Sequence, residues 1–188
     1  ECHTEADSAA LINTDNRYSG AQVPSCESCH ESVGVSGDAN PQHLLHQDKL
    51  SCQVCHSISY TSCDSCHVEI SEETGNPFFT TDGSYLTFFI GQNPNKNYHR
   101  PYEYVPVRHI PVDTESYAFY GENLLSNFDA VPTWAYATPH NIQRNTPQNE
   151  SCEACHGNAD IFLTADKVIA EELEANQPVI VDEIPPLK

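Results

Sequence analysis

One five-residue pattern occurs four times in the chain: two cysteines separated by two residues and followed at once by a histidine. In a single helical turn this spacing places both thiols on one side, where they can add to the two vinyl groups of a haem, with the histidine beneath the iron. The pattern therefore predicts covalent haem attachment at each copy. The expected thioether cysteines are Cys26, Cys29, Cys52, Cys55, Cys63, Cys66, Cys152 and Cys155, and the expected proximal ligands are His30, His56, His67 and His156.

Three other kinds of site also use closely spaced cysteines. Zinc ribbons contain C-x-x-C pairs, but zinc does not require a histidine directly after the second cysteine in every copy. A thioredoxin-like redox pair is expected once, within a βαβ unit, and the sequence shows no such context. A disulfide framework would need the thiols that the haems consume. Haem attachment accounts best for all four copies.

The ninth cysteine lies at the start of the chain, in Cys2-His3. A complete pattern there would begin two residues before Glu1. We therefore expect Cys2 and His3 to be the end of a fifth attachment motif, and the chain to be incomplete at its N-terminus. A free thiol, or attachment through one thioether, is the alternative.

The chain has enough histidines to supply two axial ligands to each expected haem iron. The chain has 10 histidines and no methionine, so we expect each iron to have two histidine ligands and a low potential. Each spare histidine could instead lie at the surface or bind a haem propionate, and a distal ligand could be exchanged with a neighbouring subunit. The sequence does not assign a histidine to each haem. The five candidate distal ligands are His43, His46, His99, His109 and His140.

Five haems in 188 residues leave about 38 residues for each, too few for separate globular folds. We expect one multihaem domain over 1–188 in which packed haems form the core, because only 38% of the residues are hydrophobic. Its expected parts are a haem-dense segment (1–73), a haem-free segment supplying distal histidines (74–148), and the last haem with a helix and an extended tail (149–188). The expected fold class is mostly irregular, with a few short α-helices and a small β-hairpin.

Local signals predict several elements. Asn40-Pro41 resembles a helix cap, which would place His43 and His46 on one side of a short helix. A β-hairpin is expected over 76–90, turning at Asp82-Gly83. Prolines predict extended chain over 101–111. Short helices are expected over 116–128 and over 165–175. The extended tail from residue 179 could lie along its own domain or dock onto another subunit.

Charge excludes some partners. The chain has 8 Lys and Arg against 27 Asp and Glu, a formal net charge of -19, which argues against nucleic acid and anionic lipid. The longest apolar stretches are far shorter than a membrane-spanning helix, so no membrane span is expected. An acidic surface suits basic redox proteins or metal-ion acceptors.

With these motifs the chain resembles the multihaem c-type cytochromes of bacteria and archaea. The tandem motifs over 52–67, preceded by His43 and His46, and His140-Asn141-Ile142 before Cys152 are loosely similar to octahaem reductase-related cytochromes. The low number of residues per haem is similar to that in the subunits of extracellular cytochrome filaments. The resemblance implies haem loading outside the cytoplasmic membrane, hence a periplasmic or cell-surface protein. The chain departs from the family in its incomplete first motif and in lacking a lysine-ligated motif.

Two functions follow as hypotheses. The first is electron transfer through closely packed haems, with polymerisation into a conductive extracellular filament as an extension, to redox protein partners or extracellular acceptors. The second is a fragment or subunit of a multihaem reductase acting on a small nitrogen or sulfur oxyanion, which needs one iron with an open face. Arg100 beside His99 and Arg108 beside His109 are the cations that could line such a site.

Overall fold

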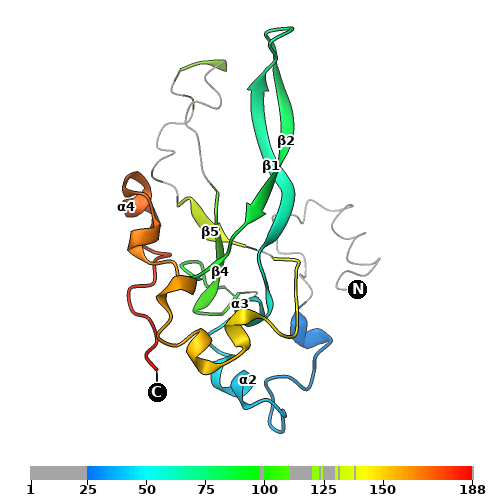
Figure 1. The fold of residues 1–188 in the computed structure, drawn as a ribbon, viewed down its shortest axis with the longest axis vertical. Helices are drawn as coiled ribbons and strands as arrows, with labels where there is room; N and C mark the ends of the chain where they lie inside the picture. Colours follow the sequence, from blue (N-terminus) through cyan, green and yellow to red (C-terminus); the bar gives the residue numbers. More distant parts are fainter. Residues whose placement is uncertain are drawn as a thin grey trace.

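The computed structural model describes residues 25–97, 100–110, 120–122, 124, 130, 132–137 and 139–187, and within 61–69 and 79–86 it describes the backbone only. The described part is mostly irregular with a few short helices, as the sequence predicts, and it also contains a small three-stranded antiparallel sheet (Figure 1). Cys2, His3, His99 and most of the helix expected over 116–128 lie outside it. No helix in these ranges is long and apolar enough to cross a bilayer.

The three-stranded sheet has the order β3 (Phe89–Gln92), β4 (Tyr104–His109) and β5 (Trp134–Tyr136). Both pairings are antiparallel, with Ile90 opposite Pro106 and Val107 opposite Tyr136. The prolines restrict this stretch to extended backbone, and β4 confirms the expectation for residues 104–109.

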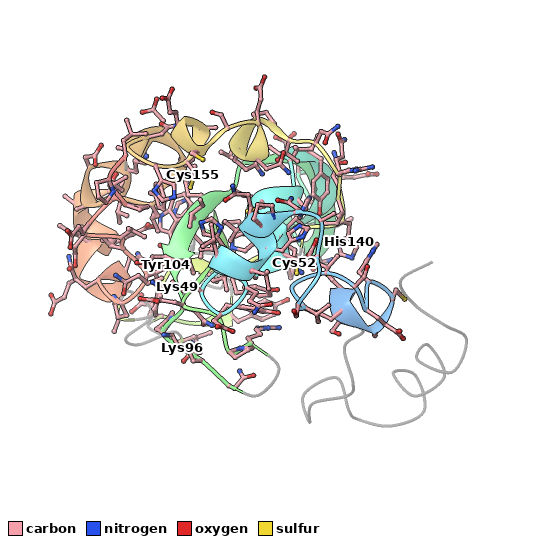
Figure 2. The ribbon with its side chains drawn as sticks, turned by 90° about the horizontal axis from the view of Figure 1, so that it is seen from below. Lys49, Cys52, Lys96, Tyr104, His140 and Cys155 are labelled. Carbon is pink, nitrogen blue, oxygen red and sulfur yellow. The ribbon has the colours of Figure 1, made fainter. Side chains whose placement is uncertain are left out.

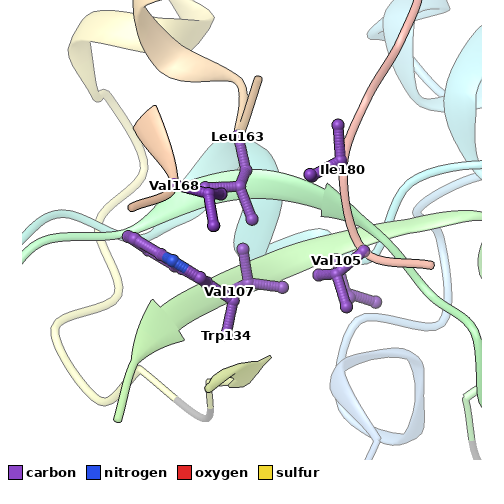
Figure 3. Close-up of a cluster of buried hydrophobic side chains, with 7 residues drawn as sticks. Val105, Val107, Trp134, Leu163, Val168 and Ile180 are labelled. Carbon is purple, nitrogen blue, oxygen red and sulfur yellow. The ribbon is translucent and has the colours of Figure 1, made fainter. Parts of the chain in front are cut away.

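A core of apolar side chains lies against β4 and β5 (Figure 3). The C-terminal tail completes it: the Gln92 amide donates to the Val179 carbonyl and the Val181 amide to the Leu163 carbonyl, at 2.8 Å each. The expectation that the tail lies along its own domain is therefore confirmed for residues 179–181. The buried members of the core are Val105, Val107, Trp134, Leu163, Val168, Val179 and Ile180.

The hairpin expected over 76–90 is wrong: residues 77–86 form a single strand, and the hairpin lies earlier in the chain. Strand β1 (Tyr60–Ile70) pairs antiparallel with β2 (Pro77–Leu86), and Asp82 lies inside β2, opposite Ser65. The turn lies at 71–76, where Gly75 adopts a φ of 67° and its amide donates to the Ser71 carbonyl at 2.8 Å. Gly-Asn is a turn signal like Asp-Gly, and the chain turns at Gly75-Asn76. The hairpin stands out from the rest of the protein (Figure 1).

The helix expected over 165–175 is not continuous. Its residues form two 3-10 turns, η8 (Ala165–Lys167) and η9 (Ala170–Glu172), followed by α4 (Leu173–Asn176). Val168 and Ile169 between the turns are extended, with ψ of 132° and 148°. Val168 is only 7% exposed within the core. Burying it against the sheet interrupts the helix that the local sequence favours.

Short helices, together with the one or two residues directly after them, carry most of the described cysteines and histidines. They are η2 (Cys26–Ser28), α2 (Pro41–His46), α3 (Cys52–His56), η5 (Pro147–Asn149), η6 (Cys152–Ala154) and η7 (Ala159–Ile161). The link between α2 and α3 is held to β4, because the Tyr104 amide donates to the Lys49 carbonyl and the Ser51 amide to the Tyr104 carbonyl. Figure 2 shows Lys49, Tyr104 and Cys52 in this region.

Candidate functional site

Three of the four motifs form a single helical turn, the geometry that the C-x-x-C-H spacing predicts. Each turn begins directly after a serine, and in η2 and η6 the side chains of Ser25 and Ser151 cap the turn by accepting a backbone amide hydrogen bond at 3.2 Å. The motif histidine then closes the turn: the His30 amide donates to the Cys26 carbonyl and the His156 amide to the Cys152 carbonyl. These turns bring the two cysteines of a motif to one side.

The fourth motif has a different backbone. Cys63, Cys66 and His67 lie in strand β1, where the register shifts between Ser62 and Ser65. A strand directs successive side chains to opposite faces, and the shift leaves Cys63 in an irregular stretch. The helical turn expected for this motif is therefore not found.

The motif histidines of α3 and η6 are oriented in the same way. Nδ1 of His56 lies 3.0 Å from the Gln143 carbonyl oxygen, and Nδ1 of His156 lies 3.0 Å from the Pro186 carbonyl oxygen. Because a carbonyl can only accept, Nδ1 carries the proton and donates in each ring. Nε2 is then the ring nitrogen left for a metal. Metal-binding histidines commonly donate their other ring N–H to a carbonyl in this way.

Helix α2 begins as the sequence predicts, with Asn40 as N-cap and Pro41 in the first turn. His43 and His46 follow about one turn apart, and the Nδ1 atom of each is also hydrogen-bonded. Nδ1 of His46 lies 2.9 Å from the Gln42 carbonyl oxygen, and Nδ1 of His43 lies 2.8 Å from Asp38 Oδ2. Their Nε2 atoms are thus the nitrogens that a metal would use.

Asp38 was not anticipated from the sequence. Its carboxylate accepts hydrogen bonds from the Asn40 and Gly34 amides, at 2.8 and 2.7 Å, as well as from His43. These backbone amides and His43 hold the pKa of the Asp38 carboxyl below its usual value. The result is a carboxylate that fixes the orientation of the His43 ring.

Each histidine of α2 lies near a motif histidine, with the two rings tilted relative to each other. The ring centroids of His43 and His56 are 6.2 Å apart, and those of His46 and His156 are 6.1 Å apart. Metal–imidazole bonds of about 2 Å and a ring radius of about 1.2 Å put the centroids of two axial ligands about 6.4 Å apart. Both pairs thus have the separation that one iron between them requires.

The thiols of different motifs also come together. Cys55 and Cys155 both pack against the buried cluster of Val54, Ile90, Phe162 and Val181. Burial, the larger cause, and the neighbouring Cys155 raise the pKa of the Cys55 thiol to about 11, and burial raises that of Cys155. Figure 2 labels Cys52 on α3 and Cys155 on the segment after η6.

A second thiol pair joins the first two described motifs. A hydrogen bond from Cys52 lowers the pKa of Cys26 to about 7, while the same contact and burial raise that of Cys52. Glu27 Oε1 accepts from the Cys52 thiol at 3.6 Å and from the Tyr102 hydroxyl at 3.1 Å. Sequence reasoning missed Glu27 and Tyr102, because only the fold brings them to Cys52.

The other candidate ligands are placed differently. His109 Nε2 lies 2.9 Å from Glu172 Oε2, and its ring stacks on Trp134 at 5.0 Å. His140 is exposed, and the Arg100 guanidinium lies over the Tyr136 ring rather than in a site. Within the described residues, no three His, Cys, Asp or Glu side chains gather as a bare metal ion would need.

No protein-family model, no curated protein and no solved structure matches this chain. The functional argument therefore depends on the chemistry of the site itself.

Proposed function

We propose that the protein is a multihaem c-type cytochrome that transfers electrons and that its irons have two histidine ligands. Two pairs of neighbouring histidines carry this proposal. The ring centroids are 6.2 Å apart for His43 with His56 and 6.1 Å apart for His46 with His156. All four rings have Nδ1 engaged, which leaves Nε2 for a metal. Beside two of these rings lie the cysteines of the same motif, on one helical turn.

The residues present fit haem c. Cys52 and Cys55 would attach one haem and Cys152 and Cys155 another, with His56 and His156 as proximal ligands. Haem iron supplies a one-electron carrier when bound. The chain's own part is to fix each imidazole by its Nδ1 contact and to close both faces of the iron, so that neither face is open to a substrate. The motifs at 26–30 and 63–67, and Cys2-His3, are proposed to attach further haems.

Charge and ligands set the expected character of the carrier. Methionine, which raises the potential as an axial ligand, is absent from the sequence, so the potentials should be low. The net charge of -19 suits basic redox proteins or metal-ion acceptors. Attachment of haem outside the cytoplasmic membrane implies a periplasmic or cell-surface location, and self-association into a filament is an extension of the same proposal.

One observation favours the reductase alternative. His109 is one of the five spare histidines, and its Nε2 bonds to Glu172. If His109 keeps that partner, the printed sequence supplies one distal ligand fewer than the five expected haems require, and one iron would have an open face. Such an iron could bind a small nitrogen or sulfur oxyanion, or accept a histidine from a neighbouring subunit.

Spectroscopy of the full chain, produced in a host that attaches haem c, tests the proposal. Intact mass and alkaline pyridine absorption would count the covalent haems, and low-temperature EPR of the oxidised protein would count the low-spin irons. We expect these counts to agree. The variant C52S/C55S should carry one haem fewer. A protein without covalent haem would overturn the proposal, and one equivalent of high-spin iron in the wild type would favour the reductase.

A further inference from the structure

We propose that helix α2 is a shared distal support: His43 binds the iron of the haem attached at Cys52 and Cys55, and His46 binds the iron of the haem attached at Cys152 and Cys155. The two motifs, far apart in the sequence, thereby form one two-haem unit. This inference depends on the proposed function, because it assigns ligands to haems whose presence is itself proposed.

The first support is the pairing itself. The ring of His43 lies 6.2 Å from that of His56 and the ring of His46 lies 6.1 Å from that of His156, both close to the separation of about 6.4 Å expected for two axial imidazoles. Positions i and i+3 of a helix lie on one face. One helix therefore supplies a ring to each of two neighbouring irons.

The second support is the segment that joins the two motifs. Residues 146–149 wrap the end of α3, where helix carbonyls lack partners within the helix. Asn149 Nδ2 donates to the Cys55 carbonyl at 3.1 Å, Thr146 Oγ1 donates to the same carbonyl, and Gln148 Nε2 donates to the Val54 carbonyl at 3.3 Å. The chain then enters η6 directly. Capping α3 thus places the 152–156 motif beside the 52–56 motif.

The third support is the way the two motifs pack. Cys55 and Cys155 contact the same buried cluster. Two haems attached there would be neighbours on the same side of α2. Electron transfer would then run between motifs that are distant in the sequence, and chain order would not be the order of the haems.

Distal substitutions in the full, haem-loaded chain test the assignment. In H43A and in H46A we expect the covalent haem count to stay constant while the low-spin EPR signal falls by one haem equivalent and a high-spin signal of the same size appears. The matched control is L45A, because Leu45 lies between the two histidines on α2 and is 68% exposed. Its low-spin count should equal that of the wild type.

Removing one haem at a time identifies the pairing. In a C52S/C55S background, H43A should cause no further loss of low-spin iron, whereas H46A should still remove one equivalent. A C152S/C155S background should give the reverse. If H43A removes a further equivalent in the C52S/C55S background, the pairing is overturned.

A conservative variant separates ligation from folding. H43M should retain the wild-type low-spin count and raise the potential of one haem, because methionine can replace histidine as the axial ligand. Unchanged low-spin counts in both H43A and H46A, with all haems attached, would overturn the shared support while leaving the proposed function intact. Absence of covalent haem from the wild type would instead overturn the proposed function.

Discussion

At the scale of single residues, the site depends on contacts that orient rings and tune thiols. Each histidine of the two neighbouring pairs has a hydrogen-bond partner at Nδ1, but only His43 has a charged one, Asp38. The thiol pKa values are shifted in opposite directions: the pKa of Cys26 is lowered by its contact with Cys52, whereas that of Cys55 is raised mainly by burial. These differences lead to three residue-scale predictions.

Replacing Asp38 by asparagine should change one haem selectively. The hydrogen bond from His43 Nδ1 to the carboxylate should strengthen the imidazole as an iron ligand, so D38N should raise the potential of one haem while its iron stays low-spin. D48N is the matched control, since Asp48 is exposed just beyond α2 and its loss changes the net charge equally. Spectroelectrochemical titration measures the effect. Equal shifts in D38N and D48N would mean that charge alone, rather than the His43 contact, sets the potential.

The same contact gives a pH dependence with a definite sign. The pKa of Asp38 is lower in the folded chain than its ordinary value of about 3.9. Its contribution to the free energy of unfolding is therefore present above that ordinary value, and it is lost as the pH falls through the lowered pKa. Acid unfolding of D38N should accordingly show a shallower loss of stability below about pH 4 than the wild type.

In the haem-free chain, Cys26 should be alkylated at neutral pH long before Cys55. The thiolate is the nucleophile, and the pKa is about 7 for Cys26 but about 11 for Cys55. Iodoacetamide labelling with peptide mapping across a pH series would give both values. C52A should shift the Cys26 profile to higher pH, while C52S keeps a donor and should shift it less. Identical profiles for Cys26 and Cys55 would contradict the contact.

At the scale of elements, the sequence predicted what depends on local chemistry. The Asn40-Pro41 cap, the common face of His43 and His46, the helical turns of three motifs and the extended backbone of β4 all follow from caps, spacing and proline geometry. Two features depend on tertiary packing, which no local pattern shows. One is the burial of Val168, which divides the helix expected over 165–175, and the other is the position of the hairpin turn.

The candidate site likewise has a part that the sequence predicts and a part that depends on the fold. The cysteines and motif histidines are readable from spacing, but their partners are not. Asp38 reaches His43 only through the loop that contains Gly34, and Glu172 reaches His109 from 63 residues away. The pairing of two motifs on α2 likewise needs the 146–149 segment to cap α3.

Asn176 should be the strongest polar determinant of stability in the C-terminal segment. Its side chain is fully buried; Oδ1 accepts from the Trp134 amide at 2.9 Å, and Nδ2 donates to Thr133 Oγ1 and to the Glu172 carbonyl. N176A would remove these three hydrogen bonds and take away the acceptor of the Trp134 amide, which should cost about 2–4 kcal/mol in the free energy of unfolding. Urea denaturation measures this loss. Q177A, at the exposed neighbouring position, should change stability by less than about 0.5 kcal/mol, and equal losses would contradict the role of Asn176.

At the scale of the whole molecule, a small side-chain core supports a surface dominated by one sign of charge. The core joins β4, β5 and the C-terminal tail, while Cys55 and Cys155, of the motifs at α3 and η6, pack against a second buried cluster. Only eight Lys and Arg side chains oppose 27 Asp and Glu side chains, which gives the formal net charge of -19. Long-range electrostatics should therefore dominate the encounter with any electron donor or acceptor.

The haem-loaded protein should discriminate between redox reagents by charge. At low ionic strength, a small cationic reductant should react about tenfold or more faster than an anionic one of matched driving force, because the negative potential concentrates cations at the surface. Added salt should slow the first reaction and speed the second until they converge, since screening acts over about 10 Å at 0.1 M. Stopped-flow reduction across a salt series measures both rates, with a neutral reductant as control. Rates independent of salt for all three reagents would mean that electrons enter at a haem edge shielded from the acidic surface, and the preference for basic partners would then be wrong.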